Sequence, residues 1–376
     1  MPVAYVEDGL LKVGGQAIRE FGVNTPELLI RWLNGPGSVS PRAPLVLTPT
    51  LQRDHLLRVL ADNGIRFVRF APFGNRPLTL RTAYLENRES FLGAFDSLVR
   101  SAESLKMALI PSLFFSATQI PPLFGENLPA LADPQSRSYE LVADITTTIV
   151  SRYKGSSAIG YWEYGNEMDG FLGIPSPKFS TAPDMGTPAA WTDDDSLPLE
   201  ICHKLTKTFL ENVRVIDSEP AYRNSPPRAT ASGWVGWRFK LSDRRDWNSS
   251  VEERFYDDAT DTLTIHPYEG LGWHNRNYTG LMIYLSMLRS KAKLRRKPVI
   301  VGEFGVSTKY QVPQSNSDEL FLSVLQQVAR SHVQLALLWA VHVANSTDPD
   351  WNFGPHSRNQ ARWHMFLNAV RNIDAL

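Results

Sequence analysis

The sequence has a single cysteine, no excess of charge and no long apolar run, and each shortage excludes a class of protein. Cys202 is the only cysteine among 376 residues, so no intrachain disulfide can form and nothing indicates an oxidising compartment. Lysine plus arginine and aspartate plus glutamate each number 39, which gives a formal net charge of +0. Without a basic excess, we expect neither nucleic acid nor an anionic membrane as a partner, and we expect a neutral ligand.

The N-terminus lacks the features of an export signal. The stretch "MPVAYVEDGLLKVGGQ" has no basic segment and no continuous apolar segment. No run of about 18 apolar residues, the length that spans a bilayer, occurs anywhere in the chain. We therefore expect no membrane-spanning helix, and the location stays open between the cytoplasm and a secreted protein whose signal has been removed.

The chain does contain a repeating pattern of amphipathic helix, turn and apolar strand. A hairpin is predicted first, at about residues 3–14, where Asp8-Gly9 separates two β-prone runs. Eight strands then alternate with helices, from "AIREFGVN" to "QLALLWAV", which predicts an α/β fold of the (β/α)8 TIM barrel type. A doubly wound open sheet is the alternative, but no glycine-rich phosphate turn follows the first strand.

One catalytic domain is expected to span residues 1–376. The stretch of about residues 170–198, after the fourth strand, is rich in Pro, Gly, Ser and Asp, and we interpret it as a long loop at the barrel mouth. The run Asp193–Asp195 within it suggests a metal site, but acidic residues there also favour the N-terminus of the next helix. Because no histidine or cysteine spacing typical of a metal site occurs either, we expect no metal and no cofactor.

Polar residues and one tryptophan stand at the ends of the predicted strands. A TIM barrel carries its reactive groups at the carboxyl ends of its strands, so these side chains should meet at one mouth. The set comprises Asn24, Arg69, Asn166, Glu167, His266, Tyr268, Glu303 and Trp339. It includes two carboxyl groups, on the fourth and seventh strands, that would face each other.

Two facing carboxyl groups are what the cleavage of a glycosidic bond requires. One protonates the leaving oxygen while the other attacks or stabilises the anomeric carbon; Glu167 would be the general acid/base and Glu303 the nucleophile. A separation of about 5–5.5 Å would give retention of configuration, whereas about 6.5–9.5 Å would give inversion. Glu163 is a rival acid, but it lies within the strand, where a structural hydrogen bond is the better interpretation.

The other strand-end residues suit supporting roles. Asn166 is placed to hold the sugar 2-hydroxyl, a contact that strengthens at the transition state. Arg69 and Tyr268 can hold the nucleophile ionised by charge and hydrogen bonding, and His266 can tune either carboxyl group. Trp339 can stack on the apolar face of a sugar, although a tryptophan there can also belong to the core.

The motifs "WEYGNE", "HPY", "GEFG" and the tryptophan of "LLWA", in this order, resemble the retaining glycoside hydrolases with catalytic carboxylates on strands four and seven. Family 5, the cellulase and β-mannanase family, is the one they resemble, and the likeness runs from "FGVN" to "LLWA". It implies that Glu167 is the acid/base, that Glu303 is the nucleophile, and that the cleavage subsite is lined by Arg69, Asn166, His266, Tyr268 and Trp339. Many cellulases of the family end strand three with a histidine, where this chain has Phe114 and Phe115; mannanase-like members often lack that histidine.

The resulting hypothesis is a retaining β-glycosidase, an O-glycosyl hydrolase that cleaves β-mannan, β-glucan or related oligosaccharides by double displacement. Its partner would be a carbohydrate, and we expect a monomer. A transglycosylase of the same mechanism and a non-catalytic carbohydrate-binding barrel are the alternatives. A lyase or isomerase for phosphorylated metabolites would need a phosphate site after the seventh and eighth strands, where Lys309 and backbone amides are the main donors.

Overall fold

The computed structural model describes residues 2–31, 46–74, 80–115, 117–168, 198–234, 259–267, 279–306, 314–343, 353–355 and 360–374. Its centre is an eight-stranded sheet with the order β10-β9-β8-β7-β4-β13-β12-β11, in which all neighbouring pairs are parallel. The strands are β4 (Glu20–Asn24), β7 (Phe67–Phe70), β8 (Ala108–Phe114), β9 (Trp162–Gly165), β10 (Thr230–Ala231), β11 (Leu263–Ile265), β12 (Val299–Phe304) and β13 (Leu335–Leu338). The predicted (β/α)8 barrel is confirmed, with one strand from each predicted run.

Side chains close the barrel where the backbone ladder stops, between β10 and β11. The Thr230 amide donates to Asp261 Oδ2 at 2.7 Å, and Thr262 Oγ1 donates to the Thr230 carbonyl at 3.2 Å. Arg214 also contacts Asp261 Oδ2. The short strands on either side of this seam are therefore joined by polar side chains in place of a regular ladder.

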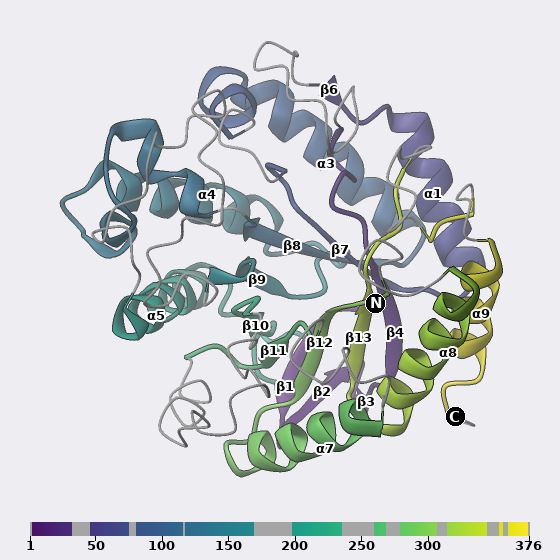
Figure 1. The fold of residues 1–376 in the computed structure, drawn as a ribbon. Helices are drawn as coiled ribbons and strands as arrows, with labels where there is room; N and C mark the ends of the chain where they lie inside the picture. The colour runs from purple at the N-terminus through teal and green to yellow at the C-terminus, as the bar shows by residue number, and fades with distance from the viewer. Residues whose placement is uncertain are drawn as a thin grey trace.

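Helices surround the sheet as an outer ring (Figure 1). They bury their apolar stripes against the strands; α3, for example, directs Phe91, Phe95 and Leu98 inward at helical spacing. None of the helices in the described ranges is long and apolar enough to cross a membrane. The helices are α1 (Thr50–Asp62), α3 (Arg88–Ser104), α4 (Arg137–Tyr153), α5 (Leu199–Ile216), α7 (Thr279–Leu294), α8 (Gln314–Arg330) and α9 (Gln360–Arg371).

Several short elements on the strand-to-helix connections were not predicted. Strands β5 (Ile30–Arg31) and β6 (Val46–Leu47) pair antiparallel. A π-helical turn, η1 (Arg81–Glu86), precedes α3. Three 3-10 turns lie between β8 and α4: η2 (Ala117–Gln119), η3 (Pro121–Phe124) and η4 (Leu128–Ala132).

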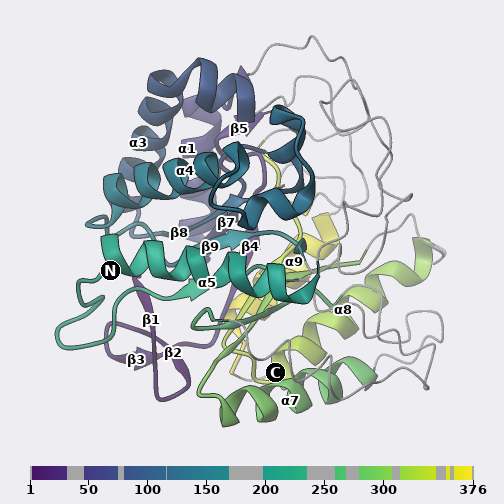
Figure 2. The ribbon, with the colours of Figure 1, turned by 90° about the vertical axis from the view of Figure 1, so that its left-hand side faces the viewer.

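The predicted N-terminal hairpin is confirmed and carries a third strand. Strands β1 (Ala4–Glu7), β2 (Leu10–Val13) and β3 (Gln16–Ala17) form an antiparallel sheet at one end of the barrel (Figure 2). The Ala4 amide donates to the Gly160 carbonyl at 2.9 Å, and the Ala229 amide donates to the Ala4 carbonyl at 2.8 Å. Because these partners precede β9 and β10, the small sheet covers the amino ends of the strands and leaves the mouth at their carboxyl ends.

Two predictions about the chain's layout fall partly beyond the described residues. The long loop expected at about residues 170–198 lies outside them, apart from residue 198. A single catalytic domain over residues 1–376 stays a prediction.

Candidate active site

The alternation of side chains along β9 sends one set outward and the other into the barrel. Trp162 and Tyr164 face the helices: Trp162 Nε1 donates to Asp217 Oδ2 at 2.7 Å, and the Tyr164 ring packs edge-on against Phe209 of α5, with centroids 5.5 Å apart. Glu163, between them, points into the barrel and is fully buried. An acidic residue in the middle of an aromatic strand therefore lies in the polar interior and not among the helices.

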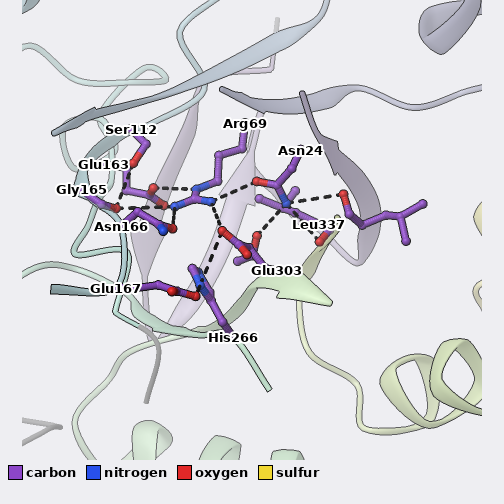
Figure 3. A network of polar contacts seen from close by, with 12 residues as sticks. Asn24, Arg69, Ser112, Glu163, Gly165, Asn166, Glu167, His266, Glu303 and Leu337 are labelled. Atoms are coloured by element: carbon purple, nitrogen blue, oxygen red, sulfur yellow. Dashed lines mark hydrogen bonds and ion pairs between the residues drawn. The ribbon is translucent and has the colours of Figure 1, made fainter. Parts of the chain in front are cut away.

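Arg69 of β7 is the hub of that interior (Figure 3). Its Nε donates to Glu163 Oε1 at 2.6 Å, and its Nη1 donates to Glu303 Oε1 at 2.9 Å and to Asn24 Oδ1 at 3.0 Å. Its Nη2 donates to Asn166 Oδ1 at 2.8 Å. Burial opposes the charge, but Glu163 and Glu303 outweigh it and raise the pKa of Arg69 above its usual value. Arg69 is therefore a fixed cation at the mouth.

Asn24, the last residue of β4, is oriented by the strands on its other side. Its Nδ2 donates to the Gly302 carbonyl at 2.9 Å and to the Leu337 carbonyl at 3.2 Å. Because the amide nitrogen is used in this way, Oδ1 is the atom that faces Arg69. The amide thereby connects β4, β12 and β13 to the guanidinium.

Glu167 stands where the chain turns sharply after β9. Its φ is 54°, in the left-handed region that few residues other than glycine adopt, and its amide donates to the Gly233 carbonyl at 2.8 Å. Gly233 also has a positive φ, and a Cβ there would lie 1.8 Å from the Gly165 carbonyl oxygen. Tight packing between the ends of β9 and β10 thus holds Glu167 in a strained conformation, a common feature of functional sites.

His266, directly after β11, joins the two carboxyl groups. Its Nδ1 lies 3.0 Å from Glu167 Oε1 and 3.6 Å from Glu303 Oε1. Its other nitrogen faces Gly302, where a Cβ would lie only 2.6 Å from Nε2, so β12 must carry a glycine here. Burial, reinforced by the charge of Arg69, lowers the pKa of His266 to about 4. The imidazole is therefore neutral near pH 7, and we place its proton on Nδ1, which has a carboxylate acceptor.

Glu303 of β12 is buried, whereas Glu167 is partly open. Their side chains are 5% and 30% exposed, so only Glu167 has substantial access to solvent. Burial raises the pKa of Glu303, and the charge of Glu167 adds to this, while His266 and Arg69 act in the opposite direction. One oxygen of each carboxyl group and a His266 nitrogen all lie within 4.8 Å of one another.

The same three side chains are, among the described residues, a group close enough to share a metal ion. Arg69 Nη1, however, lies 2.9 Å from Glu303 Oε1 and places a permanent positive charge beside that carboxylate. A cation would have to compete with this charge and with the contact between His266 and Glu167. The neighbouring charge and this contact therefore disfavour a metal ion between the three side chains.

Aromatic rings cover the hub. Phe115, directly after β8, lies with its ring centroid 5.3 Å from the Arg69 guanidinium carbon. It also stacks on Trp339, directly after β13, with centroids 6.1 Å apart and planes at 15°. The Trp339–Ala340 peptide bond is cis. The two rings together make an aromatic wall over the charged network.

The structure brings together most of the predicted site residues. Those in contact with the Arg69 hub or with each other are Asn24, Arg69, Asn166, Glu167, His266 and Glu303. Trp339 joins them through Phe115, and Tyr268 lies outside the described residues. Glu163 has a structural hydrogen bond, in agreement with its interpretation, but its partner is the hub itself. No local signal in the sequence indicated that Phe115 would cross above Arg69.

The barrel is the fold of glycoside hydrolase family 5 enzymes. The endo-1,4-β-mannanase of Rhizomucor miehei matches with a TM-score of 0.70 and 14% identity over 100% of both chains. A family 5 mannosidase from the same organism, solved as a glutamate-to-alanine variant with mannosyl-fructose, matches with a TM-score of 0.61 and 13% identity, covering 100% of this chain and 98% of that chain. A β-glucanase of Saccharophagus degradans matches with a TM-score of 0.58 and 16% identity, covering 98% of this chain and 93% of that chain.

At these identities the structural similarity establishes the fold. No protein-family model and no curated protein sequence matches the chain.

Proposed function

We propose that the chain, as one catalytic domain, is a retaining glycoside hydrolase that cleaves β-linked glycans. The observation that carries the proposal is the pair of carboxyl groups at the ends of β9 and β12, whose oxygens approach within 4.8 Å. Inversion needs about 6.5–9.5 Å between the groups so that a water molecule fits, whereas retention needs about 5–5.5 Å. The separation in this chain supports direct attack by one carboxylate.

The environments of the two glutamates support different roles. Glu303 is buried and paired with Arg69 at 2.9 Å, so it supplies the carboxylate that attacks the anomeric carbon. Glu167 is 30% exposed and supplies the proton that the leaving oxygen takes as the glycosidic bond breaks. The product of this step is a glycosyl ester of Glu303. Glu167, now ionised, then takes a proton from water, which attacks the same carbon and releases Glu303 as a carboxylate.

The surrounding residues support these two steps. His266, neutral with a proton on Nδ1, stabilises the Glu167 carboxylate that remains after the leaving oxygen is protonated. Asn166 accepts from Arg69 through Oδ1, which leaves its amide nitrogen to donate to the sugar 2-hydroxyl. Trp339 would stack on the apolar face of the sugar in the cleavage subsite.

β-Mannan is the first substrate to test, with β-glucan second. The matching structures are named as a mannanase, a mannosidase and a glucanase. The end of β8 offers phenylalanines where many family cellulases have a histidine, which favours mannan over cellulose. Phe115 places an apolar ring on that side of the mouth.

The test is hydrolysis of β-mannan, β-glucan and aryl β-glycosides, with the anomer of the first product followed by NMR. Wild type should retain configuration, Glu303→Ala should show no turnover, and Glu167→Ala should lose about 100- to 10,000-fold in kcat. Glu103→Ala is the matched control, since Glu103 belongs to the outer helix α3 and accepts from Ser156 Oγ at 2.7 Å. Inversion of configuration would refute the assignment of Glu303 as the nucleophile. If folded wild type hydrolyses none of these substrates, the proposal that the protein is a glycoside hydrolase is refuted.

A further inference from the structure

Glu163 is a buried carboxyl group that the proposed mechanism does not use. Its side chain is 0% exposed, and its Oε1 accepts from Arg69 Nε at 2.6 Å. Its Oε2 is also buried and has no hydrogen-bond partner among the described residues. A carboxylate buried in this way is costly unless it is paired. The cation that it contacts, Arg69, is also the residue that holds Glu303.

The shape of the guanidinium makes this contact directional. Its N–H groups lie in one plane with a fixed fork geometry. Glu163 takes the Nε–H, and this leaves Nη1 directed at Glu303 and Nη2 at Asn166. Fixing the Nε side therefore also fixes the rotation of the plane and the direction in which the other two nitrogens donate.

The charges make the contact electrostatic as well. Glu163 and Glu303 lie beside the same cation, so Glu303 experiences both the attraction of Arg69 and the repulsion of Glu163. A second negative charge beside the same cation favours protonation of Glu303 by Coulomb repulsion. The charged and titratable groups that act on Glu303 include Arg69 of β7, Glu167 after β9 and His266 after β11. Glu163 of β9 and the buried Tyr161, just before β9, lie near Arg69.

We propose that Glu163 is a positioning residue, which fixes the Arg69 guanidinium against Glu303 and adds a negative charge nearby, so that Glu303 keeps its proton to a higher pH than beside Arg69 alone. The inference rests on the proposed function only in calling Glu303 the nucleophile. The contact between the three side chains stands without it.

The test replaces the charge and keeps the size. Glu163→Gln is compared with Asp217→Asn, which removes another buried carboxylate paired with an arginine, at 2.8 Å from Arg228 Nη1. Glutamate side-chain carboxyl carbons are labelled with carbon-13, and the Glu303 resonance is assigned by its loss in Glu303→Gln. Its titration should move to lower pH by about one unit in Glu163→Gln and stay unchanged in Asp217→Asn.

This titration does not depend on turnover, so the two proposals fail separately. An unchanged Glu303 titration in folded Glu163→Gln overturns the positioning role whether or not the protein hydrolyses glycans. A shifted titration in a protein without turnover supports the positioning role and counts against the hydrolase. With turnover, the acidic limb of kcat/KM should move in the same direction as the titration, and a limb that stays in place would refute the link to catalysis.

A second variant serves if Glu163→Gln does not fold. Glu163→Asp keeps the negative charge but draws it back from Arg69 Nε, so that its repulsion of Glu303 weakens. Its titration should move in the same direction by a smaller amount. An unchanged titration in Glu163→Asp would also overturn the proposal.

Discussion

Replacing Arg69 with lysine tests whether the guanidinium, and not merely its charge, holds the site together. Arg69 donates to four side chains, those of Glu163, Glu303, Asn24 and Asn166. Lysine keeps the positive charge but has three N–H donors on a single nitrogen. With three donors for four acceptors, at least one acceptor must lose its hydrogen bond. We expect two to do so, because a single ammonium nitrogen cannot reach both Glu163, on the Nε side, and Asn166, on the Nη2 side.

The size of the effect follows from burial. A buried acceptor left without a donor costs about 1–3 kcal/mol, so two of them lower the free energy of unfolding by about 2–6 kcal/mol. The free energy of unfolding of a domain is typically about 5–15 kcal/mol. Arg69→Lys should therefore fold, with a clearly lower midpoint in urea.

Urea unfolding at pH 7, followed by tryptophan fluorescence, measures this change. Arg66→Lys is the control on the same segment of chain. Arg66 is 45% exposed and contacts Glu20, and an exposed ion pair is worth about 0–1 kcal/mol. If Arg69→Lys and Arg66→Lys unfold within about 0.5 kcal/mol of each other, the geometry of the hub does not stabilise the fold and the reasoning is wrong.

Three further variants test other features of the site. His266→Asn should make the free energy of unfolding less dependent on pH. The pKa of His266 is about 4 in the folded protein against an ordinary value of 6.5, so the free energy of unfolding of wild type should fall by up to about 3 kcal/mol between pH 6.5 and pH 4. Urea midpoints of both proteins at pH 7 and pH 4.5 measure this difference. Gly233→Ala places a Cβ 1.8 Å from the Gly165 carbonyl oxygen and should lower the free energy of unfolding by about 3 kcal/mol. The control Gly93→Ala, in a helix where a Cβ meets no atom within 4 Å, should raise it by about 0.5–1 kcal/mol. A lower urea midpoint for Gly93→Ala than for Gly233→Ala would refute this reasoning. Trp339→Leu should raise KM about fivefold, the equivalent of about 1 kcal/mol, and an unchanged KM would place the ring outside the subsite.

The barrel could be predicted from the sequence because each of its strands lies in a short run of residues that can be identified locally. Apolar runs and helical spacing locate β4, β7 and β12 without knowledge of their neighbours, and the barrel rule then assigns their carboxyl ends to one mouth. Arg69 and Glu303 were predicted in this way, and the two meet at 2.9 Å. The two-residue strands β3 and β5 were not predicted, because tertiary contacts form them; β10 is as short and was predicted only as part of a longer run.

The sequence did not predict how the side chains share their partners. Glu163 and Glu167 are four residues apart, yet Glu163 contacts Arg69, whereas Glu167, which has a positive φ, contacts His266. Phe115 and Trp339 follow strands that are separated in the sheet by β7 and β4. Their stacking depends on two long side chains reaching across the mouth, which no spacing along the chain encodes.

The N-terminal sheet gives the barrel a late step in its assembly. The Leu11 amide donates to Gln334 Oε1, and the two residues are 323 positions apart; Gln334 Nε2 donates back to the Leu11 carbonyl at 3.1 Å. At about 5–20 residues per second, a ribosome needs roughly 16–65 s to reach that partner after Leu11 has been made. Strand β2 therefore cannot make these contacts until residue 334 has been synthesised, and the N-terminal sheet completes this end of the barrel only then.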